Sequence, residues 1–246
     1  MAERAINMGF KLMIDFHYSD YWADPEKQFK PKAWESHSFK ELVNDVSTHT
    51  KKVLIALKEK NIYPEWVQVG NEIPNGMLWP EGKIENFDKL SKLLNSGYDA
   101  VKDVLPSSKV IIHLDQGDDR KRFIEFFDNH TANGGKYDVI GVSYYPYWVN
   151  KNYKETIDNL MNNLNEYIDR YEKEVMVCEI GGEDTEVEDT YNMLKEVIER
   201  VREIPQGKGL GVFYWEPEGA FSWSKYKLSA WGNDGKPSKA LDAFID

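Results

Sequence analysis

The amino-acid sequence predicts an α/β protein built on a parallel β-sheet. Three observations support this prediction. Short apolar runs alternate strictly with longer segments of helical periodicity, six times along the chain. Each apolar run ends in aromatic or ionisable side chains. No proline- or serine-rich linker, internal repeat or low-complexity segment divides the chain, so we expect a single domain over residues 1–246.

The bulk composition is that of a globular protein with a large core. Of the 246 residues, 41% are hydrophobic and 30% are charged. The net charge of -11 disfavours a nucleic-acid partner, because binding to a phosphate backbone depends on lysine and arginine. No apolar run is long enough to span a membrane, and residues 1–10 are too polar for a signal peptide. The charge does not oppose a neutral ligand such as a sugar, whose apolar faces stack on tryptophan and tyrosine rings.

The first predicted strand follows a short helix and precedes a long one. The helix over residues 1–9 ends at Gly9, and the apolar run 11–18 forms the strand. Ser38 and Glu41 have the spacing of a capping box, which predicts a helix from there to about Lys60. The apolar face of this helix consists of Leu42, Val46, Val53 and Leu57.

The second and third strands are predicted over residues 66–72 and 109–115. Residues 73–80 form a loop, because they contain two prolines and a glycine. The amphipathic segment 87–105 is a helix that ends before Pro106. We count Trp34 and Trp66 as core residues.

The remaining three strands follow the same alternation. A helix around residues 122–127 and a turn at 133–135 precede the fourth strand, 138–145. Helices at about 156–171 and 187–204 flank the fifth strand, 174–182. The sixth strand covers 210–217, and a terminal helix with Pro237 in its first turn completes the chain.

All the strongly polar or aromatic strand ends are carboxyl ends, which lie on one face of a parallel sheet. The pattern therefore gathers a set of side chains above one opening: His17, Glu72, His113, Tyr145, Glu179 and Trp215. This is the layout of the active site in a (β/α)8 TIM barrel, with only six strand-helix units visible in this chain.

Glu72 and Glu179 are the candidate catalytic pair. When two carboxyl groups lie about 5 Å apart, one acts as acid and then base while the other attacks the anomeric carbon, and the configuration is retained. Glu72, half desolvated at a strand end, suits the proton donor, and Glu179 suits the ionised nucleophile. Each residue also has a structural interpretation, since Glu72 could cap its turn or pair with a lysine and Glu179 could accept bonds from the backbone of residues 181–182.

Several stretches resemble glycoside hydrolase family 53 of clan A. They are residues 15–20 (DFHYSD), 22–25 (WADP), 67–72 (VQVGNE), 78–82 (LWPEG), 133–141 (NGGKYDVIG) and 214–217 (YWEP). Members of the family are arabinogalactan endo-β-1,4-galactanases that cut the galactan side chains of pectin. The resemblance covers most of the chain and implies a secreted or periplasmic protein, although no signal peptide is visible.

The resemblance implies a role for particular residues. Glu72 is the acid/base, Glu179 is the nucleophile, and Asn71 steadies the sugar 2-hydroxyl. Tyr145 lies near the nucleophile, and Trp215 forms the platform under the reacting sugar. The remaining cleft would be lined by His17, Asp20, Trp22, Trp79, His113 and Asp115. The resemblance assigns no role to Asp15 or Asp138.

The sequence departs from the family pattern in two places. Members begin with two further strand-helix units, the second with an arginine near the nucleophile, and neither is visible before Met1. We therefore expect a truncated barrel with two open sheet edges, which favour self-association. The loop after Glu179 is also short, and its acidic residues lack the alternating pattern of calcium ligands, so we predict no metal and no other cofactor.

Two alternatives stay open at this point. The chain could be another clan A β-glycanase, such as a mannanase or a cellulase. It could also be a non-hydrolytic fragment that binds galactan through the aromatic platform but lacks the contribution of the missing arginine.

Overall fold

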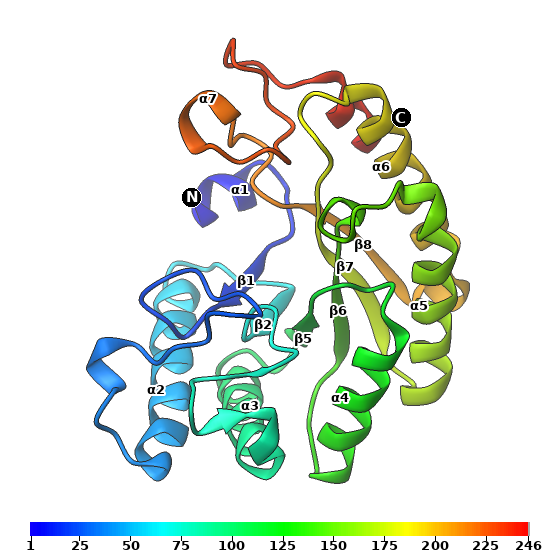
Figure 1. Cartoon of the computed structure of the whole chain (residues 1–246). Helices are drawn as coiled ribbons and strands as arrows, with labels where there is room; N and C mark the ends of the chain where they lie inside the picture. The colour runs from blue at the N-terminus through cyan, green and yellow to red at the C-terminus, as the bar shows by residue number, and fades with distance from the viewer. Residues whose placement is uncertain (246) are drawn as a thin grey trace. The chain divides into compact units, whose positions relative to one another are not determined.

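The computed structural model describes residues 1–245, which form two compact units (Figure 1). Unit 1 comprises residues 1–115 and 122–140, and unit 2 comprises residues 116–121 together with the chain from residue 141 onward. The prediction of a single domain stays a prediction.

Six parallel strands confirm the predicted (β/α)8-type fold, of which a complete barrel has eight. Their bounds are β1 (Met13–Phe16), β2 (Trp66–Val69), β5 (Lys109–Leu114), β6 (Val139–Tyr144), β7 (Glu174–Ile180) and β8 (Gly209–Tyr214). The hydrogen-bonded order is β1-β2-β5-β6-β7-β8, so β1 and β8 are the end strands. Met13 pairs with Trp66 and Trp66 with Lys109, which aligns the amino ends of β1, β2 and β5.

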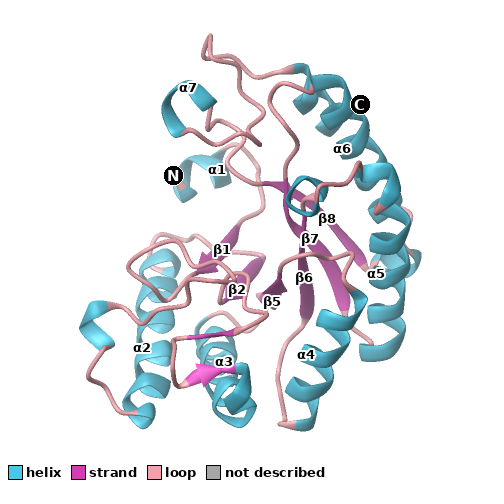
Figure 2. Cartoon of the chain, viewed as in Figure 1, coloured by secondary structure: helices cyan, strands magenta, loops and turns pink. Residues whose placement is uncertain are grey.

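Helices and short elements precede or follow the strands of unit 1, and the last of these helices begins with two residues of unit 2 (Figure 2). They are α1 (Ala2–Asn7), η1 (Lys32–Trp34), α2 (Phe39–Lys58), β3 (Gly76–Met77), β4 (Gly82–Lys83), η2 (Ile84–Asn86), α3 (Phe87–Val104) and α4 (Arg120–Ala132), where η denotes a 3₁₀ helix. The loop predicted at 73–80 thus contains one strand of a two-stranded antiparallel hairpin, β3-β4.

The described part of unit 2 contains three α-helices and four 3₁₀ helices. They are η3 (Pro146–Val149), η4 (Tyr153–Glu155), α5 (Ile157–Tyr171), α6 (Val187–Arg202), η5 (Pro205–Gly207), α7 (Phe221–Ser224) and η6 (Lys239–Phe244). β8 pairs in parallel with β7, with two register shifts along the pair.

The capping box of α2 forms as predicted. The Ser38 hydroxyl accepts the Glu41 N–H, and the Glu41 carboxylate accepts the Ser38 N–H. The buried face differs in part from the predicted one, because it consists of Leu42, Val46, Thr50 and Leu54. Val53 and Leu57 are only half-buried. Thr50 can be buried because its hydroxyl donates to the Val46 carbonyl and bonds the Tyr18 hydroxyl.

A glycine allows α3 to approach β2 closely. A Cβ on Gly97 would lie 2.5 Å from Cγ1 of Val69, which is too close for any larger residue. Gly97 and the leucines of α3 are buried, as is every residue of β2. This packing fixes the strand that leads to Glu72.

Two helix predictions were wrong in extent or type. α4 runs past Phe127 to Ala132, because His130 continues its buried face and bonds Ser91. The terminal helix is a 3₁₀ helix whose N-cap is Ser238, so Pro237 precedes the helix instead of lying in its first turn. Its buried residues, Ala240 and Ala243, are three apart, which is the period of a 3₁₀ helix.

The two tryptophans counted as core behave differently. Trp66 is buried on β2, whereas Trp34 is half-buried in η1 and packs edge-on against His49. Within residues 1–245, no helix combines the length and the apolar character needed to cross a membrane.

Replacing Ser38 with alanine removes the side-chain acceptor at the start of α2. We expect the variant Ser38→Ala to lose about 1 kcal/mol of unfolding free energy. Urea unfolding followed by circular dichroism measures this loss. Thr48→Ala, at an exposed position inside the same helix, is the control and should not destabilise the protein; an equal loss in both variants would contradict the role of the cap.

Candidate active site

Glu72 lies just beyond β2, where the backbone turns sharply. Gly70 has φ +84°, and a Cβ there would lie 3.0 Å from Ile73 and 3.2 Å from Met77. Glu72 itself has φ +43°, in the left-handed region that glycine favours. The turn is anchored on both sides, because the Gly70 N–H donates to Phe16 and the Ile73 N–H donates to His113. The half-buried position of Glu72 agrees with the sequence prediction.

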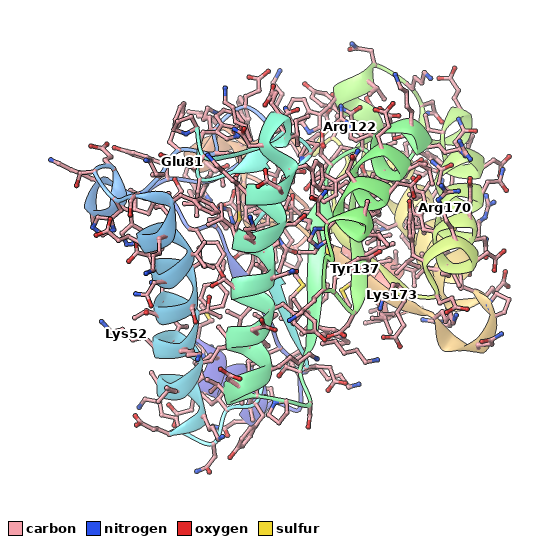
Figure 3. All side chains as sticks on the ribbon, turned by 90° about the horizontal axis from the view of Figure 1, so that it is seen from below. Lys52, Glu81, Arg122, Tyr137, Arg170 and Lys173 are labelled. Carbon is pink, nitrogen blue, oxygen red and sulfur yellow. The ribbon has the colours of Figure 1, made fainter. Side chains whose placement is uncertain are left out.

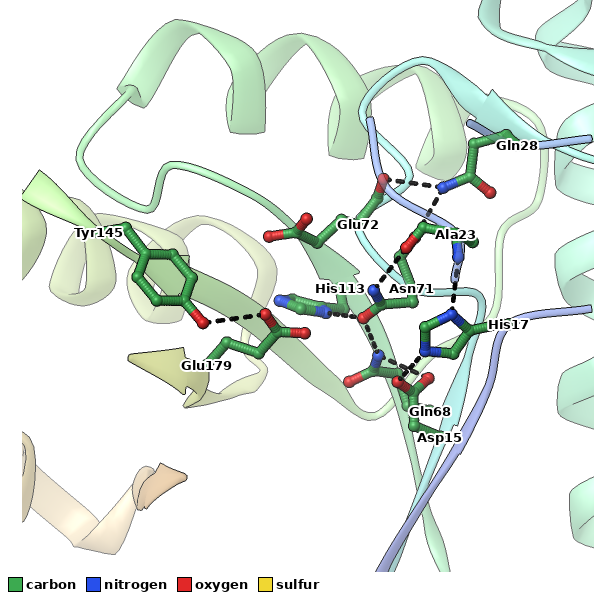
Figure 4. Close-up of polar contacts among 10 residues, drawn as sticks. All are labelled: Asp15, His17, Ala23, Gln28, Gln68, Asn71, Glu72, His113, Tyr145 and Glu179. Atoms are coloured by element: carbon green, nitrogen blue, oxygen red, sulfur yellow. Dashed lines mark hydrogen bonds and ion pairs between the residues drawn. The ribbon is translucent and has the colours of Figure 1, made fainter. Parts of the chain in front are cut away.

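A closed set of hydrogen bonds joins the ends of β1 and β2 (Figure 4). The Ala23 N–H donates to Nδ1 of His17 at 2.8 Å, so Nε2 carries the ring proton and donates to Asp15 at 3.0 Å. Nε2 of Gln68 donates to the other Asp15 oxygen at 2.8 Å and to Oδ1 of Asn71 at 2.9 Å. Nδ2 of Asn71 donates to the Ala23 carbonyl at 2.9 Å, and this hydrogen bond completes the ring.

The ring fixes the amide orientation of Asn71, which is only 4% exposed. Its Oδ1 accepts from Gln68 and lies 3.0 Å from Nδ1 of His113, and its Nδ2 donates to Ala23. An amide carries two N–H groups, so the second one on Nδ2 is available as a donor. This geometry suits the predicted contact with a sugar hydroxyl.

His113 on β5 is fully buried and neutral. Burial lowers the pKa of its imidazole to about 3, and nearby His17 lowers it further when charged. Because Oδ1 of Asn71 can only accept, Nδ1 of His113 carries the proton in this contact. His113 therefore donates a second hydrogen bond to the Asn71 oxygen, beside the one from Gln68.

Three predicted cleft residues line one open hollow of about 580 Å³. The three predicted residues are His17, Asp20 and Trp22. Ser19, Tyr21 and Lys27 complete the lining of the hollow. Trp22 and Tyr21 are 66% and 80% exposed, which leaves two aromatic faces accessible to a ligand. Tyr21 is not among the predicted cleft residues, although it lies in the same loop as Trp22.

Three of the predicted cleft residues of unit 1, Trp79, Asp115 and Asp20, have structural partners. The indole N–H of Trp79 donates to the Asn75 carbonyl, and Phe29 packs edge-on against its ring. Asp115 forms an ion pair with Arg122, which is labelled in Figure 3. The carboxylate of Asp20 accepts the Lys32 N–H. These contacts hold the side chains in place, and their roles in binding stay predictions.

The two aspartates without an assigned role differ in function. Asp15 belongs to the ring beside His17, whereas Asp138 accepts the Val110 N–H and pairs with Lys102 at 2.7 Å. Asp138 is therefore structural.

In unit 2, Glu179 is the penultimate residue of β7 and is only 7% exposed. The Tyr145 hydroxyl donates to its Oε2 at 3.2 Å (Figure 4), as the resemblance implied. Tyr145 in turn shares a side-chain hydrogen bond with Tyr226, whose pKa is raised by burial. A hydrogen bond from a tyrosine hydroxyl stabilises the ionised carboxylate that a nucleophile needs.

Two glycines after Glu179 allow the chain to pass close to other groups. A Cβ on Gly181 would lie 2.9 Å from the Leu228 carbonyl, and one on Gly182 would lie 2.4 Å from Oγ1 of Thr190. The Tyr214 hydroxyl donates to the same Leu228 carbonyl at 2.8 Å. Trp215, which follows Tyr214, is half-buried. Its backbone N–H donates to the carbonyl of Ile180, the residue next to Glu179.

Several site residues lack a sequence signal that could have found them. Gln28 and Tyr226 lie outside the recognised stretches, and their partners Asn71 and Tyr145 are far away in the chain. Gln68 lies in the VQVGNE stretch beside its partner Asn71, but its other partner, Asp15, is 53 positions away and begins the DFHYSD stretch.

The family model described as glycosyl hydrolase family 53 matches residues 1–244. This chain belongs to that family. A protein of Niallia circulans, from the region 5′ of bgaB, is 38% identical over 95% of this chain and 72% of its own length. The arabinogalactan endo-β-1,4-galactanase A of Aspergillus niger is 33% identical over 88% of this chain and 67% of its own. The family 53 catalytic domain of Ignisphaera aggregans is 33% identical with a TM-score of 0.89, covering 99% of this chain and 75% of that one.

The lowered pKa of His113 leads to a prediction about its protonation. We expect long-range ¹⁵N–¹H NMR spectra to place the proton on Nδ1 and to show no titration between pH 8 and pH 5. The folded pKa of about 3 is below the unfolded value near 6.5, so protonation favours unfolding and stability falls as the pH drops from about 6.5 towards 3. His113→Gln assigns the signal, and a His113 midpoint near pH 6.5 would contradict the prediction.

Proposed function

We propose that this family 53 chain is an endo-acting, retaining glycoside hydrolase that cleaves β-1,4-galactan. The observation that carries the proposal is the placement of Glu72 and Glu179, each at the carboxyl end of a parallel strand. The Aspergillus niger relative, named an arabinogalactan endo-β-1,4-galactanase, supports the choice of substrate.

In the first step, Glu179 attacks the anomeric carbon and the bond to the leaving sugar breaks. The Glu72 carboxylic acid gives its proton to the departing oxygen, and a covalent glycosyl-enzyme forms. This double displacement requires the two carboxyl groups about 5 to 5.5 Å apart. The hydrogen bond from Tyr145 keeps the Glu179 carboxylate ionised and oriented before the attack.

In the second step, the Glu72 carboxylate removes a proton from water, which attacks the same anomeric carbon. Glu179 leaves, and the product keeps the β configuration. The donor N–H of Asn71 binds the sugar 2-hydroxyl, where a hydrogen bond strengthens in the transition state. The hydrogen bonds of Asn71 with Gln68 and Ala23 keep this N–H pointed at the 2-hydroxyl while the reaction proceeds.

Aromatic side chains supply the binding surface for the polymer. Trp215 forms the platform beneath the reacting sugar, and Trp22 and Trp79 extend the surface to neighbouring sugars. His17, Asp20, His113 and Asp115 complete the polar lining. The site needs no metal or other cofactor, because both proton transfers and the nucleophilic attack come from carboxyl groups.

The cellular context and partners follow from the same proposal. The polymer is too large to enter a cell intact, so we place the enzyme outside the cytoplasm, secreted or periplasmic. The net charge of -11 argues against nucleic acid as a partner. The end strands β1 and β8 offer edges at which a second chain can pair.

The catalytic assignment is tested with linear β-1,4-galactan as substrate. We expect Glu72→Gln to lower turnover by about 10² to 10⁴-fold, because the proton donor is lost. Glu179→Gln should abolish turnover, because no covalent intermediate forms. Release of reducing ends measures the activity, and Glu85→Gln, at an exposed position on η2, is the control. Full activity in either catalytic variant would exclude this mechanism.

The substrate and the stereochemistry are tested on the unaltered protein. We expect cleavage of β-1,4-galactan but not of mannan or cellulose, because the axial 4-hydroxyl of galactose gives its polymer a different shape. Proton NMR taken early in the reaction should detect the β-anomer first. Preferred cleavage of another polymer would favour a different β-glycanase, and binding of galactan without turnover would indicate a non-hydrolytic protein.

A further inference from the structure

Gln28 is a buried amide in the loop between β1 and α2, and its side chain is only 1% exposed. Its Nε2 donates to the Asn71 carbonyl at 2.7 Å and to the Glu72 carbonyl at 3.1 Å (Figure 4). A third acceptor, the Asp24 carbonyl, lies at 3.1 Å in its own loop. One amide nitrogen thus connects the loop after β1 to the backbone on both sides of the Glu72 Cα.

The two carbonyls that Gln28 binds belong to the two peptide units that flank the Glu72 Cα. The Asn71 carbonyl belongs to the peptide unit before the Glu72 Cα, and the Glu72 carbonyl belongs to the unit after it. A donor that binds both carbonyls fixes the two peptide planes relative to each other. It therefore constrains φ and ψ of Glu72, and with them the direction of the Cα–Cβ bond.

Glu72 needs such a constraint more than most residues do. Its φ of +43° is unfavourable for a side chain with a Cβ and persists only where surrounding contacts impose it. Gly70 and Ile73 anchor the two ends of the turn, and Gln28 binds its centre. In a relaxed backbone with negative φ, the carboxyl group of Glu72 would point elsewhere.

We propose that Gln28 is a positioning residue for the general acid/base, which acts by locking the backbone of Glu72 in its left-handed conformation. This inference rests on the proposed role of Glu72. Gln28 itself touches no substrate and exchanges no proton. Its effect is confined to the reaction steps in which Glu72 gives or removes a proton.

Two substrates distinguish a misplaced general acid from a general loss of active-site structure. Aryl glycosides of β-1,4-galactobiose differ only in the leaving group: 2,4-dinitrophenol departs without a proton, whereas unsubstituted phenol needs one. The ratio kcat/KM reports the steps up to bond cleavage, which include the protonation by Glu72 and exclude its later role as base. A misplaced acid therefore slows the phenyl substrate alone.

The variants are Gln28→Ala and Gln28→Met, the second of which retains most of the side-chain volume without a donor. We expect kcat/KM for the phenyl substrate to fall by about 10 to 100-fold, because a displacement near 1 Å has effects of this size. For the dinitrophenyl substrate we expect a change of no more than about twofold. Thermal unfolding identifies folded variants.

The matched control is Asn75→Ala. The Asn75 side chain donates to the Pro25 carbonyl at 2.9 Å, so it also ties the loop after β1 to the segment after β2. It does not bind the Asn71 or Glu72 carbonyl. Both aryl substrates should be cleaved normally by this variant.

The outcomes distinguish the two proposals. Equal losses on both substrates, or no loss on the phenyl substrate in folded Gln28→Met, would overturn the role of Gln28. If Glu72→Gln also cleaves both substrates normally, the proposed function itself fails. If Glu72→Gln loses the phenyl substrate alone while Gln28→Met does not, only the positioning role is excluded.

Discussion

The side chain of Gln68 connects the carboxyl ends of two parallel strands, and the arrangement of unit 1 around the candidate site depends on it. Its amide nitrogen donates to Asp15 beyond the middle of β1 and to Asn71 just after β2. The backbone register already aligns Asp15 with Gln68. The side-chain hydrogen bonds of Gln68 extend this alignment into the loops, where backbone hydrogen bonds between strands are absent. Displacing these side chains would cost free energy, because their buried polar groups would lose their partners.

Polar groups at the strand ends of this protein are arranged as connected sets instead of isolated pairs. Asp15, His17, Ala23, Gln68 and Asn71 form a ring, and His113 joins it through Asn71. Each amide and imidazole therefore has a defined orientation, which a single contact would not provide. A site that must bind specific sugar hydroxyls benefits from donors and acceptors that cannot rotate.

Unit 2 supports Glu179 by a different means. The carboxylate receives a hydrogen bond from Tyr145, and small residues follow it so that the Leu228 carbonyl and Thr190 can approach. Tyrosines surround this strand end, and burial raises the pKa of Tyr214 to about 12. These hydroxyls stay protonated at neutral pH and act as donors. In the proposed mechanism Glu179 is the nucleophile, and donors of this kind stabilise the charge of its carboxylate without neutralising it.

The sequence alone determined the fold class, the six strand-helix units and the residues at the strand ends. Periodicity, capping residues such as Ser38 and Glu41, and strand-end pairs such as Asn71 and Glu72 are local features, and local features can be read from a chain. Only the tertiary structure decided the full length of α4, the left-handed conformation of Glu72 and the partners of Gln28 and Gln68. These depend on contacts between residues 39 or more positions apart, such as His130 with Ser91, Gln28 with Asn71 and Gln68 with Asp15, for which a linear pattern has no signal.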